Sequence, residues 1–399
     1  MLARYYQSSP SAEEIKAYVS LITKSVWTRP RANLDKPLVL YGAGNLGAMA
    51  AEYFSSLSIS VKNLYDADPA GIDPERFENY DITVAPLSTA GSSIKSEAIL
   101  VVCIANCVYS SLRAELLSQG WRDVRHFYEV TNELKDQHPL SNGWTKDHLT
   151  ERDISELEAC MAHWEDDRSR SHHLQFIAWH LLSEEWSFED APIQFVDRYF
   201  IPEVRSVLSS HESFVDVGTH HGESITAFHE AVCGSFKDIS AFEPDPANRA
   251  IAQERLGQLA LKPDDCKMWA CALSDDPGER PFFYGGGYAS QLWNKSEHVV
   301  EVRRLDDMQL KPSVLKLHIE GAELAALKGA ARTLQTFRPI VMATVYHDSQ
   351  GIHEVARWLE SMLHQYRFYF RLHAGAGTGA VVYAIPSERQ AKVPGGEYV

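Results

Sequence analysis

The chain reads Phe214-Val-Asp-Val-Gly-Thr-His-His-Gly222 and, a little further on, Ala241-Phe-Glu-Pro244. Each stretch is a short apolar run with one acidic residue near its end, Asp216 in the first and Glu243 in the second. Apolar runs of this length, bounded by turn residues and followed by helical patterns, predict strands of a parallel sheet. Because the carboxyl ends of such strands meet at one edge, we expect both carboxylates side by side at the rim of one crevice.

Further apolar runs complete this sheet. Strands are predicted at 214–217, 239–242, 267–271, 314–319 and 340–346, and an antiparallel hairpin is predicted at 368–372 and 380–384. The hairpin surrounds a glycine-rich segment, which is typical of a tight turn. We expect this C-terminal α/β domain to cover residues 206–390.

A second α/β unit precedes it. Strands are predicted at 38–41, 61–65, 98–104 and 124–128, with helical patterns at 48–54 and 108–119. Strands that alternate with helices indicate a parallel, doubly wound sheet. The fold class is therefore α/β, with two doubly wound Rossmann-like units. The predicted division is a helical segment at 1–30 (its helix over 12–26), a Rossmann-like accessory domain at 31–135, a helical connector at 136–205 and the C-terminal domain.

The N-terminal unit contains a glycine-rich turn, Gly42-Ala-Gly44-Asn-Leu-Gly47, between a strand and a helix, and Asp66 follows the next strand. This is the context in which such a motif binds a dinucleotide. The unit could bind NAD, a nucleotide-sugar or another nucleotide as a second cofactor, and an NAD- or nucleotide-sugar-dependent oxidoreductase is the alternative function. No Tyr-x-x-x-Lys pair accompanies the turn, so redox chemistry has no visible catalyst. Equally, the glycines could serve only to pack the helix on its strand.

Composition excludes several partners. The 399 residues carry a net charge of −16 and no basic run, which argues against nucleic acid. No apolar stretch of about 18 residues predicts a membrane span, and no signal-peptide pattern is evident. Six cysteines without a C-x-x-C pair favour free thiols in a reducing compartment. We expect a cytoplasmic protein, and the sequence leaves its oligomeric state open.

The turn after the first C-terminal strand favours a cationic ligand. Asp216 would repel a pyrophosphate but attract a cation, and S-adenosylmethionine carries an ammonium and a sulfonium. Gly218 allows close backbone approach, Gly222 opens a helix, and Glu243 can accept hydrogen bonds from both hydroxyls of a ribose. The bland alternatives are that Asp216 caps the helix and that Glu243 is a surface residue.

Several motifs occur in an order that resembles the FkbM-type methyltransferase family. The resemblance rests on the two stretches above and on Ala272-Leu-Ser-Asp275, Arg304-Leu-Asp-Asp307, Lys316-Leu-His-Ile-Glu-Gly-Ala-Glu323 and Leu327-Lys-Gly-Ala330, and it covers roughly residues 165–386. It implies a seven-stranded methyltransferase fold, S-adenosylmethionine as cofactor, and O-methylation of a sugar, glycan or secondary metabolite. It further implies that Asp216 and Gly218 line the methionine end, Glu243 the ribose, and Cys271, Ala272 and Leu273 the adenine.

One position departs from that family, which usually has Asp where this chain has His318. A neutral imidazole with a pKa of about 6.5 is a credible base for the acceptor proton. His318 could instead bind a metal or have only a structural role. Glu320 and His347 are the other predicted catalytic residues, and no metal site is assigned.

The acceptor is not identified by the sequence. We expect a small molecule or glycan whose recognition depends on the insertion at 285–297 and on the N-terminal half. The triplet Gly285–Gly287 predicts a mobile flap there. A further alternative is a cofactor-binding module without turnover.

Overall fold

The structure is a computed structural model that describes residues 3–25, 31–73, 75–140, 142–259, 261, 265–286 and 289–390. Two parallel sheets dominate it, one in each half of the chain, so the predicted α/β fold class is confirmed. None of the helices in these residues has the length and apolar character needed to cross a bilayer.

The N-terminal sheet has five parallel strands in the order β4-β3-β2-β5-β6. They are β2 (Leu38–Tyr41), β3 (Val61–Asp66), β4 (Val84–Pro86), β5 (Ile99–Val102) and β6 (Asp123–His126), with helices α2 (Asn45–Ser56), α3 (Glu75–Glu78), α4 (Ser92–Glu97), α5 (Tyr109–Ser118) and α6 (Phe127–Thr131). Strands β2 and β5 are buried along their whole length, as expected for a parallel sheet covered on both faces. Strand β4 was not predicted, because three residues that include a proline give no periodic signal.

The C-terminal sheet has seven strands, as predicted, and their order is β10-β9-β8-β15-β16-β18-β17. They are β8 (Ser213–Val217), β9 (Asp238–Phe242), β10 (Cys266–Trp269), β15 (Val314–Leu317), β16 (Ile340–Thr344), β17 (Tyr366–Leu372) and β18 (Ala380–Pro386), and the last two form the antiparallel hairpin. Helices α9 (Pro202–Arg205), α10 (Glu223–Ala231), α11 (Pro246–Gln258), α12 (Glu323–Lys328), α13 (Ala331–Phe337) and α14 (Glu354–Met362) accompany it. Strand order reverses between β8 and β15, where ligands of such sheets bind.

Alternate residues of the central strands enter two different cores. Phe214 and Val314 pack on one face of the sheet, and Val215 and Leu315 pack on the other. Asp216 and Lys316 are register partners on neighbouring strands and therefore share a face. This pairing decides what Asp216 can contact.

A small sheet of order β11-β14-β12-β13 was not predicted. It comprises β11 (Ala272–Leu273), β12 (Gly278–Phe283), β13 (Gln291–Leu292) and β14 (Val299–Arg303). Two of these strands have only two residues each, which is too short for a period of two to show in the sequence.

The first 30 residues are not only helical. Strand β1 (Ala3–Tyr6) pairs in parallel with β7 (Glu185–Phe188), and α1 (Ile15–Lys24) packs on α7 (Glu151–His163) and α8 (Asp167–Leu182). Tyr6 stacks on Phe188 with ring centroids 4.9 Å apart. A four-residue strand paired with a partner about 180 positions away leaves no local signature, so the helical prediction for 1–30 missed it.

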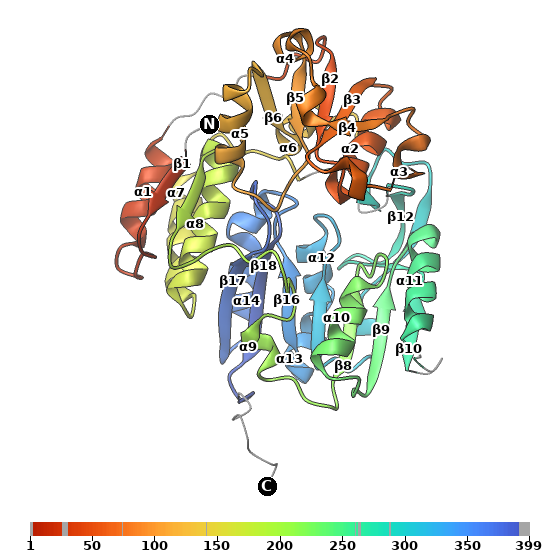
Figure 1. The fold of residues 1–399 in the computed structure, drawn as a ribbon. Helices are drawn as coiled ribbons and strands as arrows, with labels where there is room; N and C mark the ends of the chain where they lie inside the picture. The colour runs from red at the N-terminus through yellow and green to blue at the C-terminus, as the bar shows by residue number, and fades with distance from the viewer. Residues whose placement is uncertain are drawn as a thin grey trace.

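Helix α8 lies between the two α/β units. Phe176 packs in the core of the C-terminal sheet, whereas Trp179 packs in the N-terminal core. The amide of Gly375, in the hairpin, donates to the carbonyl of Ala105 at 2.7 Å. Through these contacts the N-terminal unit lies over the C-terminal sheet, at the end to which the arrow of β9 points (Figure 1).

The start of α7 predicts a pH-dependent contribution to stability. Asp153 accepts hydrogen bonds from the Thr150 amide and from His353 and Lys146. Burial opposes the charge, but these contacts hold the pKa of Asp153 below its usual range. A depressed folded-state pKa gives stability that is present above the unfolded value of about 3.9 and is lost as pH falls below it. We expect Asp153→Asn to cost about 1–2 kcal/mol at pH 7 and less at pH 3 in urea titrations; equal losses would contradict this.

Candidate functional site

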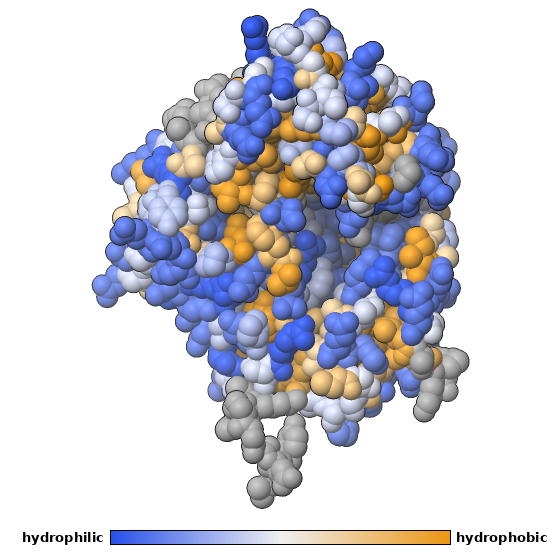
Figure 2. Space-filling view, viewed as in Figure 1, coloured by the Kyte–Doolittle hydropathy of each residue, from blue (hydrophilic) through white to orange (hydrophobic). Residues whose placement is uncertain are grey.

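A crevice of about 450 Å³ lies at the carboxyl ends of β8, β9 and β15. Its walls also come from residues 195–200 and from the small sheet. Figure 2 shows this face of the molecule hollowed between the N-terminal unit and the C-terminal sheet. Five carboxylates and three side-chain cations line the crevice: Asp197, Glu223, Glu230, Glu243 and Glu320 against Arg198, Arg205 and Lys316. This excess of negative charge suits a ligand that carries positive charge.

The glycine turn after β8 forms one wall. Gly218 lines the crevice with a φ of +76°, and a Cβ there would lie 1.9 Å from the carbonyl oxygen of His318. Only glycine permits this approach of β8 to the end of β15. Gly222, with φ of +85°, is the N-cap of α10, as predicted from its position, although it is not among the lining residues.

Glu243 lies in the crevice, as predicted. Its side chain is 5% exposed, and its two oxygens accept hydrogen bonds from the amides of His220 (2.8 Å) and Asp245 (2.9 Å). Burial raises the pKa of Glu243. Each carboxylate oxygen has a second lone pair, so Glu243 can still accept two hydrogen bonds from a ligand.

Asp216 does not share that crevice, and the predicted pairing of the two carboxylates is wrong. Asp216 is fully buried, its Oδ1 lies 2.9 Å from Nζ of Lys316, and its Oδ2 accepts a hydrogen bond from Ser224 at 2.6 Å. Lys316 also donates to the Gly218 carbonyl at 2.7 Å. Burial works against this ammonium, but attraction to Asp216 outweighs it and raises the pKa of Lys316. Asp216 therefore supports the turn from beneath, through Lys316 and Ser224, and does not line the crevice.

The three residues predicted to contact an adenine lie on one wall of the crevice. Cys271, Ala272 and Leu273 all line the crevice, at the start of the small sheet. Trp269 lies outside it and stacks on Phe242 with an interplanar angle of 7°, a packing role.

His318 lies on the crevice wall between two tyrosines. Its Nδ1 lies 2.7 Å from the Tyr199 hydroxyl, and its Nε2 lies 2.9 Å from the Tyr346 hydroxyl and 3.3 Å from Oε1 of Glu320. Burial lowers the pKa of His318 to about 4, so the ring is neutral near pH 7. A base this weak is poorly matched to the proton of an alcohol.

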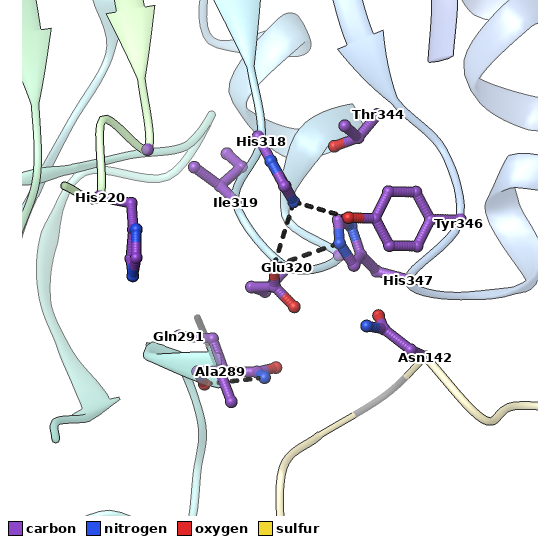
Figure 3. A network of polar contacts seen from close by, with 12 residues as sticks. Asn142, His220, Ala289, Gln291, His318, Ile319, Glu320, Thr344, Tyr346 and His347 are labelled. Carbon is purple, nitrogen blue, oxygen red and sulfur yellow. Dashed lines mark hydrogen bonds and ion pairs between the residues drawn. The ribbon is translucent and has the colours of Figure 1, made fainter. Parts of the chain in front are cut away.

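Glu320 and His347 continue this network (Figure 3). Glu320 lines the crevice, but His347 does not: it is 1% exposed, with Nε2 3.2 Å from Glu320 Oε1 and Nδ1 3.0 Å from Glu323 Oε1. Burial opposes protonation of His347, yet the two carboxylates outweigh it and raise its pKa to about 10. Burial likewise opposes the charge of Glu320, and the two histidines hold its pKa below the usual range. His347 is therefore not placed to take a proton from a substrate, contrary to its predicted catalytic role.

The two tyrosines were missed by the sequence reasoning, which considered Glu323 only as a residue that could cap the following helix. Glu323 accepts hydrogen bonds from the amides of Ile319 and Gly321 and from Thr344, which fixes the loop after β15. The available signal was its place in the first turn of α12, where a carboxylate can reach back to the preceding loop. Tyr199 carried no signal, because it reaches His318 from a segment 119 positions earlier.

Two glycines of the N-terminal turn are in close contact with the surrounding protein. A Cβ on Gly47 would lie 2.0 Å from the Gly42 carbonyl, and one on Gly42 (φ +104°) would meet Ile104 and Cys103, whereas Gly44 is open. The Asp66 carboxylate accepts hydrogen bonds from the backbone amides of Ala43 (2.7 Å) and Asp68 (2.9 Å). These contacts explain the motif as a scaffold, and a second nucleotide there stays a prediction.

The insertion at 285–297 reaches the crevice through Ser290, Gln291 and Leu292. Asp245 anchors it by accepting hydrogen bonds from the Gly285 amide (3.0 Å) and the Ser290 hydroxyl (2.8 Å). Gly287, part of the predicted flap, lies outside the described residues, and the flap's mobility stays a prediction.

Comparisons with known proteins agree with this geometry. Residues 216–368 match the family model described as Methyltransferase FkbM domain. The chain is similar to the crystal structure of methyltransferase FkbM from Methylobacillus flagellatus KT, with 16% identity, a TM-score of 0.62 and coverage of 93% of this chain and 98% of that chain. At this identity the likeness shows a shared fold.

Two other solved structures match over a smaller part of the chain. An rRNA methylase from Streptococcus thermophilus has 9% identity, a TM-score of 0.30 and coverage of 45% of this chain and 89% of its own. A methyltransferase from Podospora anserina, bound to SAH, has 10% identity, a TM-score of 0.30 and coverage of 64% and 93%. No curated protein gave a significant match.

Proposed function

We propose, from the match of residues 216–368 to the FkbM methyltransferase domain model, that the chain transfers a methyl group from S-adenosylmethionine to a hydroxyl oxygen. The acceptor we propose is a sugar, a glycan or a hydroxylated metabolite. The observation that carries the proposal is Glu243, a buried carboxylate with free acceptor capacity inside the crevice over β8 and β9.

The donor would lie along this crevice. Its ribose hydroxyls would donate to Glu243, its adenine would lie against Cys271, Ala272 and Leu273, and its methionine end would lie against the Gly218 turn. The excess of carboxylates in the lining supports a donor that carries a sulfonium and an ammonium. Asp216 was predicted to attract the cationic methionine end of the donor, but it is paired with Lys316. In this proposal the carboxylates that line the crevice provide that attraction instead.

The acceptor would lie at the end of the crevice that holds His318 and Glu320. Transfer breaks the bond from sulfur to the methyl carbon and forms one from the acceptor oxygen, which releases S-adenosylhomocysteine and a proton. The main contribution of the chain is to hold the oxygen in line with the methyl group. Glu320 can orient the acceptor by accepting its hydroxyl hydrogen. Neutral His318 and charged Glu320 both have pKa values well below that of an alcohol, so neither is a strong base for it.

Two measurements test the proposal. Calorimetry should show S-adenosylhomocysteine binding with one site per chain, and an assay with a labelled methyl group should show transfer to hydroxylated sugars or metabolites. Tight binding of NAD(H) without binding of S-adenosylhomocysteine would favour an oxidoreductase instead. Binding without transfer to any of a broad acceptor panel would favour a module without turnover.

A further inference from the structure

We propose that His318, Glu320 and His347 bind one divalent transition-metal ion at the acceptor end of the crevice, with Zn²⁺ the best chemical match. The ligand atoms are Nε2 of both histidines and a carboxylate oxygen of Glu320. The site itself stands on geometry, and only its role in catalysis rests on the proposed function.

The spacing of these atoms fits a metal better than it fits hydrogen bonds. Oε1 of Glu320 lies 3.3 Å from Nε2 of His318 and 3.2 Å from Nε2 of His347, and the three groups offer ligand atoms within 4.8 Å of one another. Ligands held at about 2.0–2.1 Å from a tetrahedral Zn²⁺ are about 3.3 Å apart, whereas hydrogen bonds between charged groups are about 2.7–2.9 Å long.

One of these atoms lacks a well-aligned hydrogen bond. Nε2 of His347 is buried and lies at ion-pair distance from Oε1 of Glu320, 3.2 Å, but it makes no hydrogen bond of good geometry to any described residue. Buried polar atoms are nearly always satisfied, so an exception at a cluster of ligand-type side chains points to an absent partner. Figure 3 shows both rings meeting the Glu320 carboxylate.

The other nitrogen of each ring is already fixed. Nδ1 of His347 is 3.0 Å from Glu323, and Nδ1 of His318 is 2.7 Å from the Tyr199 hydroxyl. Metal-binding histidines use their second nitrogen in this way, which orients the ring and directs the first nitrogen to the ion. Glu320 has a left-handed backbone with φ of +54°, a conformation that costs energy in a non-glycine residue and is retained where a side chain must be aimed.

The ligand types select the class of metal. Two imidazoles and one carboxylate suit Zn²⁺ and neighbouring first-row ions, and Mg²⁺ or Ca²⁺ would require more oxygen ligands. Three protein ligands leave a position open toward the crevice, as in catalytic zinc sites. For an ion to bind, the Tyr346 hydroxyl must give up its 2.9 Å contact with Nε2 of His318.

Such an ion would supply what the residues lack. Near it, an acceptor hydroxyl bound at the open position would lose its proton more easily, so no side-chain base of high pKa would be needed.

The test uses the full chain without a histidine tag, stripped with a chelator and titrated with Zn²⁺ against an indicator, with Co²⁺ as a spectroscopic probe. We expect one ion per chain and a Co²⁺ spectrum typical of four or five ligands. His318→Gln and Glu320→Gln should each weaken binding by at least about 100-fold, and Glu323→Gln by about 10–100-fold. His211→Gln, which removes an exposed imidazole, should leave the affinity within about threefold.

A second cluster, His220, His221 and Glu223, makes the test specific. Loss of the ion in His220→Gln, but not in His318→Gln, would overturn the proposal, as would the absence of a saturable site in the folded protein. Binding of S-adenosylhomocysteine by each variant reports its fold. Metal binding without methyl transfer would support the metal site and refute the proposed function. Methyl transfer by a protein that binds no metal would support the proposed function and refute the metal site.

Discussion

Replacing Glu243 with alanine is expected to weaken binding of S-adenosylhomocysteine by at least about 100-fold. In the proposed complex two ribose hydroxyls donate to this carboxylate, and hydrogen bonds to a charged group contribute about 1.5–3 kcal/mol each. The carboxylate is held in place by the amides of His220 and Asp245, so it is set for the ligand before binding. Calorimetric titration of the variant and the parent protein measures the effect.

Two matched variants separate this role from a general loss of structure. Glu243→Gln keeps an acceptor for the turn amides but removes the charge, and we expect a loss of about tenfold. Asp66→Asn alters the acidic residue of the N-terminal turn and should leave the affinity within about twofold. If Glu243→Ala binds S-adenosylhomocysteine as tightly as the parent protein, or if Asp66→Asn causes the larger loss of affinity, the donor does not lie over β8 and β9.

Replacing Lys316 with methionine is expected to lower the free energy of unfolding by about 3–5 kcal/mol. Lys316 is 2% exposed and Asp216 is fully buried, and removal of the ammonium leaves that carboxylate without its counter-charge. The remaining contact from Ser224 does not neutralise it. Chemical denaturation at pH 7 gives the change.

The double variant Lys316→Met, Asp216→Asn is the control for this pair. It removes both charges, and we expect it to recover about half or more of the lost stability, because a neutral buried pair has no uncompensated charge. A cost below about 1 kcal/mol for Lys316→Met alone would show that the pair behaves like an exposed one.

Much of the fold could be predicted because its signals are local. The seven strands of the C-terminal sheet are apolar runs between turn residues, and each predicted run from 214–217 to 380–384 overlaps an observed strand. Gly218 also allows the close backbone approach that was predicted for it, and Gly222 begins a helix as predicted. Strand β1 and the two-residue strands β11 and β13 could not be predicted, because they form only through pairing with distant partners.

The candidate site was predicted less completely, for a related reason. Strand ends place Glu243 and the segment from Cys271 to Leu273 in the crevice whatever the details of packing. Whether Asp216 could face a ligand depended on the register between β8 and β15, which places Lys316 opposite it. His347 follows a strand of the same sheet, yet contacts with Glu320 and Glu323 turn it into the interior, and a sequence does not show which way a side chain turns.

A crystal structure of the chain with S-adenosylhomocysteine tests the central claim most directly. We expect the ribose hydroxyls within about 3.2 Å of the Glu243 carboxylate, with the adenine against Cys271, Ala272 and Leu273. A nucleoside bound instead at the Gly42–Gly47 turn, or a Glu243 carboxylate without contact to it, would contradict the assignment of this crevice to the methyl donor.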